Sequence, residues 1–247
     1  MTRESIVLGA ASLADEEYFQ EKKQMVVATR ERTKEELRRR GFEVLDSSAN
    51  FLFAKPNSVD AGWLFEELKK DYVSGVTFSG GEPTLQAKAL IPLFQRLKEQ
   101  NIHICIDTNG SIWNEEVEEL LKWTDLVLLD IKEFNNVRHR QLTERSNEQT
   151  IRTAEWLEKN GKPFWLRYVL VPGYSSFEED IRALGEHFKN YHMIQRVEIL
   201  PYHTLGIHKY EAMGKEYKLN GIKENTLEQL ETAKTLFGEY FNTVYLN

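Results

Sequence analysis

The chain has 247 residues, of which 41% are hydrophobic and 29% are charged, the balance of an ordinary globular protein. No apolar run approaches the ~20 residues of a membrane-spanning helix. The residues after Met1 show no apolar core with a cleavage site, so we expect a cytoplasmic protein without a membrane partner. The net charge of −7 argues against nucleic acid as a partner, because nucleic-acid-binding surfaces are basic.

Elements of mixed type are predicted before residue 72. A long helix is expected over 15–40 and ends at Gly41, because glycine readily adopts the left-handed conformation found after a helix end. Two short extended segments follow, over 43–45 and 50–54, and the apolar spacing predicts a further helix over 58–70. Residues 1–72 are therefore expected to form a small α+β segment.

A regular alternation of strands and helices begins after Gly75 and is expected to form a second domain over 73–247. Two of its helices are predicted to begin with capping boxes, Ser146-x-x-Gln149 and Ser176-x-x-Glu179. The alternation predicts a parallel sheet with right-handed crossovers, and its short apolar strands suit a sheet covered on both faces. The expected strands cover residues 76–78, 102–106, 126–129, 164–171 and 197–200.

Polar residues gather after the expected strands. Parallel sheets and barrels carry their chemistry at the carboxyl ends of the strands, so these residues are expected to converge on one rim. A mid-strand arginine, Arg167, adds a cation in the fourth strand. The segments that follow the other strands are Ser79-Gly80-Gly81-Glu82-Pro83, Asp107-Thr108-Asn109-Gly110, Asp130-Ile131-Lys132 and Pro201-Tyr202-His203.

Five ordered motifs resemble those of the glycyl-radical-enzyme activases, most closely the pyruvate formate-lyase activating enzymes, over about residues 75–247. The resemblance implies an α/β fold: a partial (β/α) barrel of the radical S-adenosylmethionine (SAM) type that lacks its usual first strand. It also implies an oxidoreductase that uses SAM and a [4Fe–4S] cluster to abstract hydrogen from a glycine of its partner, pyruvate formate-lyase. The motifs are Thr77–Pro83, Asp107–Gly110, Leu129–Lys132, Trp165–Tyr168 and Leu200–Lys209.

The resemblance assigns SAM-binding roles to matching positions. The loop Gly80–Glu82 resembles the one that receives the methionine amino group, because glycines let the backbone approach a ligand and a carboxylate pairs with an ammonium. Lys132 and His203 resemble residues that contact the SAM carboxylate and the ribose or adenine. The implied cofactor-binding set is Gly80, Gly81, Glu82, Asp107, Thr108, Asp130, Ile131, Lys132, Arg167 and His203.

Some of these residues have alternative interpretations. Asp107, Thr108 and Asp130 resemble the family's monovalent-cation and SAM-proximal groups, although each is equally suited to cap a helix or to bind a strand-end amide. For Arg167, contact with SAM or substrate and structural pairing with Asp130 are equal alternatives. No catalytic residue and no metal ligand is assigned.

The cysteines that hold the family's cluster are missing. Members of the family carry a C-x-x-x-C-x-x-C motif after their first strand, but residues 10–72 contain no cysteine and Cys105 is the single cysteine of the chain. The sequence therefore predicts no stable cluster, weak SAM binding and an inactive activase. The alternative function is a truncated barrel that binds SAM or a partner without chemistry. A zinc site from His203, His208 and Cys105 is a weak further possibility.

Residues 4–70 resemble a different family, the small domain of histidinol-phosphate aminotransferases. A pyridoxal-phosphate enzyme needs a Schiff-base lysine in a large domain, which this sequence lacks. We expect residues 50–54 to replace the lost first barrel strand beside residues 76–78. The alternative keeps the aminotransferase arrangement, in which residues 50–54 pair antiparallel with residues 43–45. The motifs behind this resemblance are Glu16–Phe19, Thr29–Arg32, Gly41–Leu45 and Ser48–Phe53.

Overall fold

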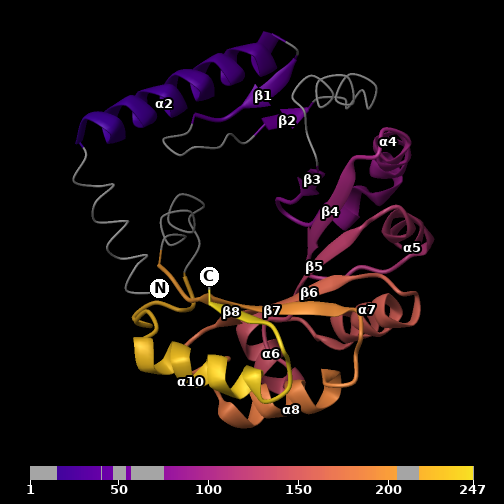
Figure 1. Ribbon diagram of the computed structural model, residues 1–247, viewed down its shortest axis with the longest axis vertical. Helices are drawn as coiled ribbons and strands as arrows, with labels where there is room; N and C mark the ends of the chain where they lie inside the picture. The colour runs from indigo at the N-terminus through magenta and orange to yellow at the C-terminus, as the bar shows by residue number, and fades with distance from the viewer. Residues whose placement is uncertain (1–15, 40, 47–53, 57–74, 205–216, 247) are drawn as a thin grey trace. The chain divides into compact units, whose positions relative to one another are not determined.

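The computed structural model describes residues 16–39, 41–46, 54–56, 75–204 and 217–246 (Figure 1). The chain divides into two compact units, residues 1–64 and 65–247, and each is described by itself. Along these described ranges, no helix has both the length and the apolar character needed to cross a membrane.

The first unit contains one long helix and a two-stranded sheet. Helix α2 (Glu16–Arg39) ends before Gly41, as predicted: the glycine has a φ of 84° and its amide donates to the Arg38 carbonyl at 3.0 Å. Strands β1 (Phe42–Val44) and β2 (Ala54–Pro56) pair antiparallel. The Arg38 guanidinium donates to a carbonyl of β1 at 2.9 Å, so the helix and the sheet are joined.

The pairing of Ala54 corrects the prediction that residues 50–54 replace the first barrel strand. Ala54 lies opposite Val44 in antiparallel register, which is the alternative arrangement. The segments that pair are close in sequence, and closing a short loop costs less chain entropy than forming a distant crossover. Residues 50–53 and the expected helix over 58–70 lie outside the described residues.

The second unit is built on a parallel sheet in which neighbours in space are neighbours in sequence, in the order β3-β4-β5-β6-β7-β8. This order confirms the predicted α/β class and the open, incomplete barrel. Strand β8 is additional to the predicted strands. The strands are β3 (Gly75–Phe78), β4 (His103–Thr108), β5 (Leu126–Asp130), β6 (Phe164–Leu170), β7 (Ile194–Pro201) and β8 (Val244–Leu246).

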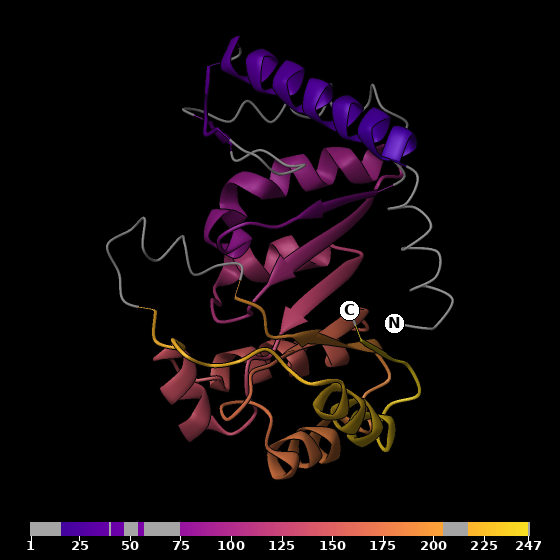
Figure 2. The same ribbon diagram turned by 90° about the vertical axis from the view of Figure 1, so that its left-hand side faces the viewer.

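Helices connect the strands and lie along the outer face of the curved sheet (Figure 1; Figure 2). The helices that the structure describes in this unit therefore cover one face, and the covering of the other face stays a prediction. These are the 3₁₀ turn η1 (Pro83–Gln86) and the α-helices α4 (Ala87–Glu99), α5 (Glu115–Lys122), α6 (Asn136–Thr143), α7 (Glu148–Lys159), α8 (Glu178–Phe188) and α10 (Leu227–Gly238).

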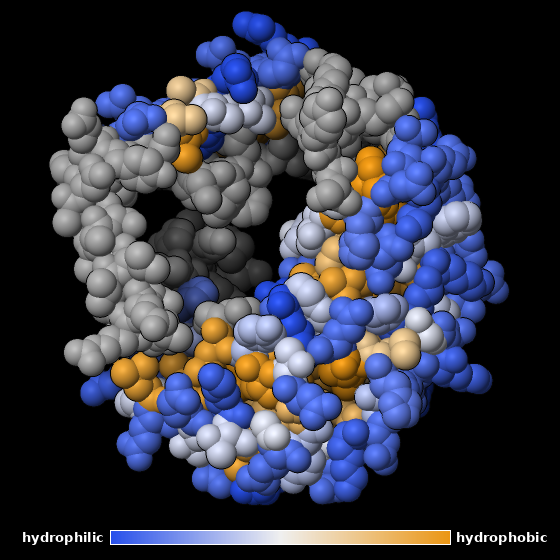
Figure 3. Space-filling model, in the orientation of Figure 1, coloured by the Kyte–Doolittle hydropathy of each residue, from blue (hydrophilic) through white to orange (hydrophobic). Residues whose placement is uncertain are grey.

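The core lies between the sheet and these helices. Residues of β5 and β6 alternate between buried and half-buried, and the buried ones, such as Leu129 and Tyr168, face the helix layer. Helix α8 contributes the fully buried Leu184 and Phe188, each worth roughly 1.5–3 kcal/mol on burial. The outward surfaces of the helices are mostly hydrophilic (Figure 3). Because side chains alternate along a strand, the half-buried residues of β5 and β6 lie on the opposite, inner face of the sheet.

The helix starts differ from the predicted capping boxes. Helix α7 begins after Asn147 and α8 after Phe177, and neither start has a side-chain cap hydrogen bond. The two serines make other bonds: the Ser146 hydroxyl donates to the Asn136 side chain at 3.0 Å and accepts the Glu148 amide at 3.3 Å, and the Ser176 hydroxyl accepts the Gly173 amide at 3.0 Å. Local turns therefore use these serines. A capping box forms instead at α10, between Thr226 and Gln229.

Candidate functional site

The loop after β3 exposes its backbone. Gly80 and Gly81 have φ values of 95° and 58°, a region that side chains make costly. Among the described residues, a Cβ atom built on either glycine meets nothing within 4 Å, so open space lies against the backbone. This loop can therefore bring main-chain groups close to a ligand, as the sequence predicts for Gly80–Glu82.

The Glu82 carboxylate ties the end of β3 to the end of β4. Its Oε1 accepts hydrogen bonds from the Thr84 hydroxyl (2.6 Å), the Thr84 amide (3.1 Å) and the Thr108 hydroxyl (2.7 Å). Its Oε2 accepts the Asn109 amide at 2.9 Å. Each carboxylate oxygen offers about two acceptor sites. Among the described residues Oε2 has this one donor, so it can accept one more from a ligand.

Arg167 of β6 is surrounded by carboxylates from three other strands. Register places it beside Asp130 on β5 and Glu198 on β7. Its Nη1 donates to Asp107 Oδ1 at 2.8 Å, and its Nε lies 3.7 Å from Asp130 Oδ1 and 3.6 Å from Glu198 Oε2. The Ser79 hydroxyl donates to the other oxygen of Asp107 at 3.0 Å. The predicted structural pairing of Arg167 with Asp130 is therefore present.

The charged cluster around Arg167 raises the pKa of that side chain and contains buried polar atoms without hydrogen-bond partners. Burial alone would lower the pKa of Arg167, but the neighbouring carboxylates, Asp130 foremost, outweigh it and raise that pKa. Lys132 donates to Asp130 Oδ2 at 2.6 Å. Asp130 Oδ1 and Arg167 Nε are buried without a hydrogen-bond partner within the described chain. Such orphaned groups suit contact with a polar ligand.

His203 follows β7 at the same end of the sheet and is exposed. The residue before it is fixed: the Tyr202 amide donates to the Asn225 side chain at 2.8 Å, and the hydroxyls of Tyr202 and Tyr217 lie 2.8 Å apart. The structure therefore presents His203 from an anchored segment at the rim. His208, the other histidine of the suggested zinc site, lies outside the described residues.

A pocket of about 240 Å³ adjoins the rim at the end of β5. Sequence reasoning predicted its Asp130 and Lys132, but missed the hydroxyl-bearing and basic residues of the α6–α7 region. Buried His139 was not marked by any motif; its Nδ1 lies 2.7 Å from the Arg145 carbonyl, and burial lowers its pKa. The pocket is lined by Asn109, Ser111, Asp130, Lys132, His139, Thr143, Arg145, Ser146 and Thr150.

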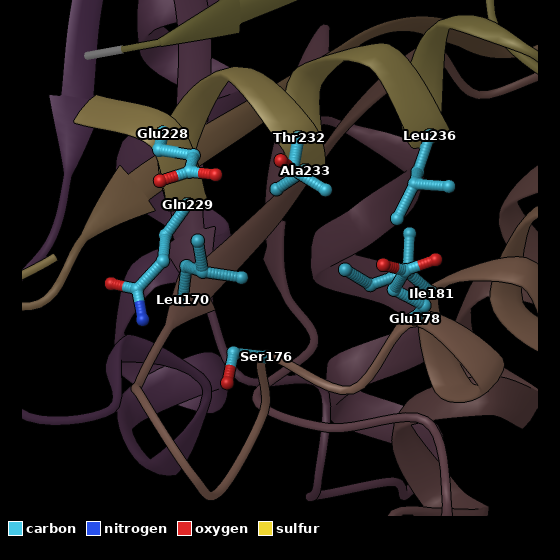
Figure 4. A pocket seen from close by; sticks show the side chains of 9 residues that line it. All are labelled: Leu170, Ser176, Glu178, Ile181, Glu228, Gln229, Thr232, Ala233 and Leu236. Carbon is cyan, nitrogen blue, oxygen red and sulfur yellow. The ribbon is translucent and has the colours of Figure 1, made fainter. Parts of the chain in front are cut away.

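A second pocket, of about 220 Å³, lies on the helix side of the sheet between α8 and α10 (Figure 4). Leu170, the last residue of β6, points into it from the strand, and Glu228 and Leu236 line it from α10 (Figure 4). Leu170 belongs to the buried face of β6, whereas Arg167 belongs to the other face. This pocket is therefore separate from the predicted site.

The donor set does not fit a [4Fe–4S] cluster. Cys105 on β4 is the single cysteine of the sequence and is 7% exposed, and burial raises the pKa of its thiol to about 11. Fe–S clusters are held by several thiolates. In the described residues, no group of three or more His, Cys, Asp or Glu side chains could hold a metal ion.

Comparisons with known proteins agree with the motifs. The sequence model of the Radical SAM superfamily matches residues 64–185. The chain is 41% identical over 172 residues to "Pyruvate formate-lyase 1-activating enzyme" of Escherichia coli (strain K12), which covers 69% of this chain and 70% of that relative. It is 44% identical over 187 residues to "Pyruvate formate-lyase-activating enzyme" of Streptococcus mutans, with 71% of each chain covered.

A solved structure supports the fold. A domain of pyruvate-formate lyase-activating enzyme from Bacteroides vulgatus is similar with a TM-score of 0.59 and 22% sequence identity. The similarity covers 70% of this chain and 99% of that chain. At this identity the likeness bears on the fold alone.

Proposed function

The chain belongs to the pyruvate formate-lyase activating enzymes of the radical SAM superfamily, and from this membership we propose that its strand-end rim binds SAM but does not generate a radical. The observation that carries the proposal is that the residues expected to bind SAM are present, whereas the cysteines that would hold the cluster are not. The rim groups Gly80–Glu82, Asp130, Lys132 and Arg167 stand at one edge of the sheet, whereas the sequence offers one cysteine where a cluster needs several.

The residues of the rim have the chemistry to bind SAM, a cofactor that supplies a sulfonium and an α-amino acid group. The Gly80–Gly81 backbone has open space beside it, and Glu82 Oε2 can accept one more donor, such as an ammonium. Lys132 offers a cation to a carboxylate. His203 presents its ring from the end of β7. Binding is expected to be weak, because SAM gains no bond to iron.

Calorimetric titration of SAM tests this assignment. Gly81→Trp places a large side chain in the open space of the loop, at a φ of 58°, and should remove the binding heat. Gly161→Trp is the matched control: Gly161 has a φ of 64° and equally open surroundings, but lies between α7 and β6 at the other edge of the sheet. SAM binding that is unchanged by Gly81→Trp would overturn the assignment.

Activation of pyruvate formate-lyase is the second candidate function, and family membership favours it. It requires reductive cleavage of SAM by a cluster, which one cysteine does not support. The two candidate functions, SAM binding alone and activation of pyruvate formate-lyase, are distinguished by anaerobic reconstitution with iron and sulfide. Iron counting and electron paramagnetic resonance then follow. About four iron atoms per chain and a SAM-perturbed signal would establish the activase; we expect neither. Co-sedimentation with pyruvate formate-lyase tests whether the partner is still bound.

A further inference from the structure

A buried carboxylate lies directly behind the rim, at Glu133. Beyond the end of β5 the strand alternation continues, so that Val127, Leu129, Ile131 and Glu133 share the face packed against the helices. The first three are apolar, and Glu133 is 0% exposed like Leu129 and Ile131. The alternation calls for an apolar residue here, because burying a carboxylate is costly unless it is paired.

The Glu133 carboxylate fixes the connection from β5 to α6. Its Oε1 accepts the Asn135 amide at 2.8 Å, and its Oε2 accepts the Tyr168 hydroxyl of β6 at 3.3 Å. The Asn147 side chain holds the same segment by its backbone, donating to the carbonyls of Glu133 (3.0 Å) and Phe134 (2.6 Å). Side-chain and main-chain bonds thus anchor the segment to β6 and to the start of α7.

No cation offsets this carboxylate within the described chain. On α6, Arg138 faces the region but pairs with Asp180 and Glu179 of α8. Asp180 adds a second negative charge, and from β6 the neighbour is the neutral Tyr168 hydroxyl. Burial, reinforced by Asp180, raises the pKa of Glu133 to about 7. The geometry alone leaves an unpaired buried acid beside the rim.

The anchored segment leads directly into the rim. Lys132 precedes Glu133 and donates to Asp130 at 2.6 Å, while the Ile131 amide donates to the Arg167 carbonyl at 2.9 Å. A shift of Glu133 therefore moves Lys132. We infer that Glu133 is a positioning residue, which holds Lys132 at the rim through its buried hydrogen bonds and makes SAM binding there dependent on its protonation. The inference rests on the proposed function, since SAM is the ligand.

The protonated and the ionised forms of Glu133 differ in how much free energy their burial costs. The protonated acid keeps the Asn135 bond and donates to the Tyr168 oxygen, so its position is satisfied without charge. The ionised form places a buried negative charge near Asp180, and Arg138, which pairs with Asp180 and Glu179, makes no bond to it. We therefore expect the segment to be held more tightly, and SAM to bind more tightly, at pH 6 than at pH 8.

The experiment measures SAM affinity by calorimetry between pH 6 and pH 8 in the full chain, together with hydrogen–deuterium exchange of residues 130–137 without ligand. The wild type should lose several-fold in affinity across this range and exchange faster at pH 8, after correction for intrinsic rates. Glu133→Gln should flatten both profiles, because the amide accepts the Asn135 bond and donates to the Tyr168 oxygen, as the protonated acid does, without a charge. Tyr168→Phe removes a donor to the ionised form and should move the transition to higher pH.

Controls separate Glu133 from other titrations. The amino group of SAM titrates in every variant, so the difference between profiles reports Glu133. Glu155→Gln, at an exposed position of α7, should keep the wild-type profile. An identical pH dependence in wild type and Glu133→Gln overturns the inference. If no variant binds SAM at any pH, the proposed function fails, while the exchange profile still decides whether Glu133 holds the segment.

Discussion

Glu133 also has a consequence for stability, at the scale of a single residue. Burial raises its pKa in the folded protein from 4.5 to about 7. The folded chain therefore keeps a proton that the unfolded chain releases at lower pH. The stabilisation due to this group is complete below pH 4.5 and is lost as the pH rises through about 7.

Glu133→Gln should therefore make the protein more stable at pH 8, by on the order of 3 kcal/mol at most, and change little below pH 4.5. The amide has no charge to bury and preserves both hydrogen bonds. Urea unfolding at pH 4 and pH 8 measures the effect, with Glu155→Gln as the exposed control. A variant that is less stable than the wild type at pH 8 would contradict the raised pKa.

At the scale of elements, the contact of α8 with the C-terminal segment depends on Gly185. A Cβ atom at this position would collide with the ring of Tyr240, so the glycine lets the ring pack directly on the helix. Gly185→Ala should destabilise the protein by about 1–3 kcal/mol, as overpacking does in cores. Thermal unfolding measures it. Gly238 of α10 has open surroundings, so Gly238→Ala should be neutral or slightly stabilising; an equal result at both positions would refute the contact.

The elements that could be predicted from sequence are those with a strong local pattern. The apolar runs of β4 to β7 marked their strands, and glycine marked the end of α2. Strand β8 was missed because Val244–Leu246 is too short to show a period. The capping boxes at Ser146 and Ser176 were wrong because a serine three residues before Gln or Glu also suits a tight turn. The pattern does not say which backbone groups compete for the hydroxyl.

In the candidate site, too, the features with a local sequence pattern were predicted and those that depend on distant contacts were missed. The rim residues were predicted because each follows a strand, and a parallel sheet brings strand ends together. The pairing of Arg167 with Asp130 was foreseen as one alternative, but its contacts with Asp107 and Glu198 were not. Those contacts depend on register across strands, which no local pattern determines. Glu133 was missed because its burial is visible only once α6 and β6 are in place.

At the scale of the whole second unit, Arg167 links four strands through one side chain. Arg167→Met keeps much of the packing but leaves Asp107, Asp130 and Glu198 without their common cation. Asp130 keeps Lys132 and Glu198 keeps Arg196, so the loss should stay below the roughly 3–5 kcal/mol of a buried pair that loses its only partner. Carboxylates repel one another when they are charged and lose this repulsion in acid, so the loss should be largest at neutral pH and shrink toward pH 4.

Urea unfolding at pH 4.5 and pH 7.5 tests this, since urea does not screen charges as guanidinium does. Arg182→Met is the matched control, because Arg182 pairs with Glu239 at a surface position where the side chains are 43% and 44% exposed. That variant should change stability little at either pH. An Arg167→Met loss of equal size at both pH values would mean that Arg167 stabilises the sheet by packing and not by charge. A larger loss at pH 7.5 would establish the carboxylate cluster as the electrostatic link between β4, β5, β6 and β7.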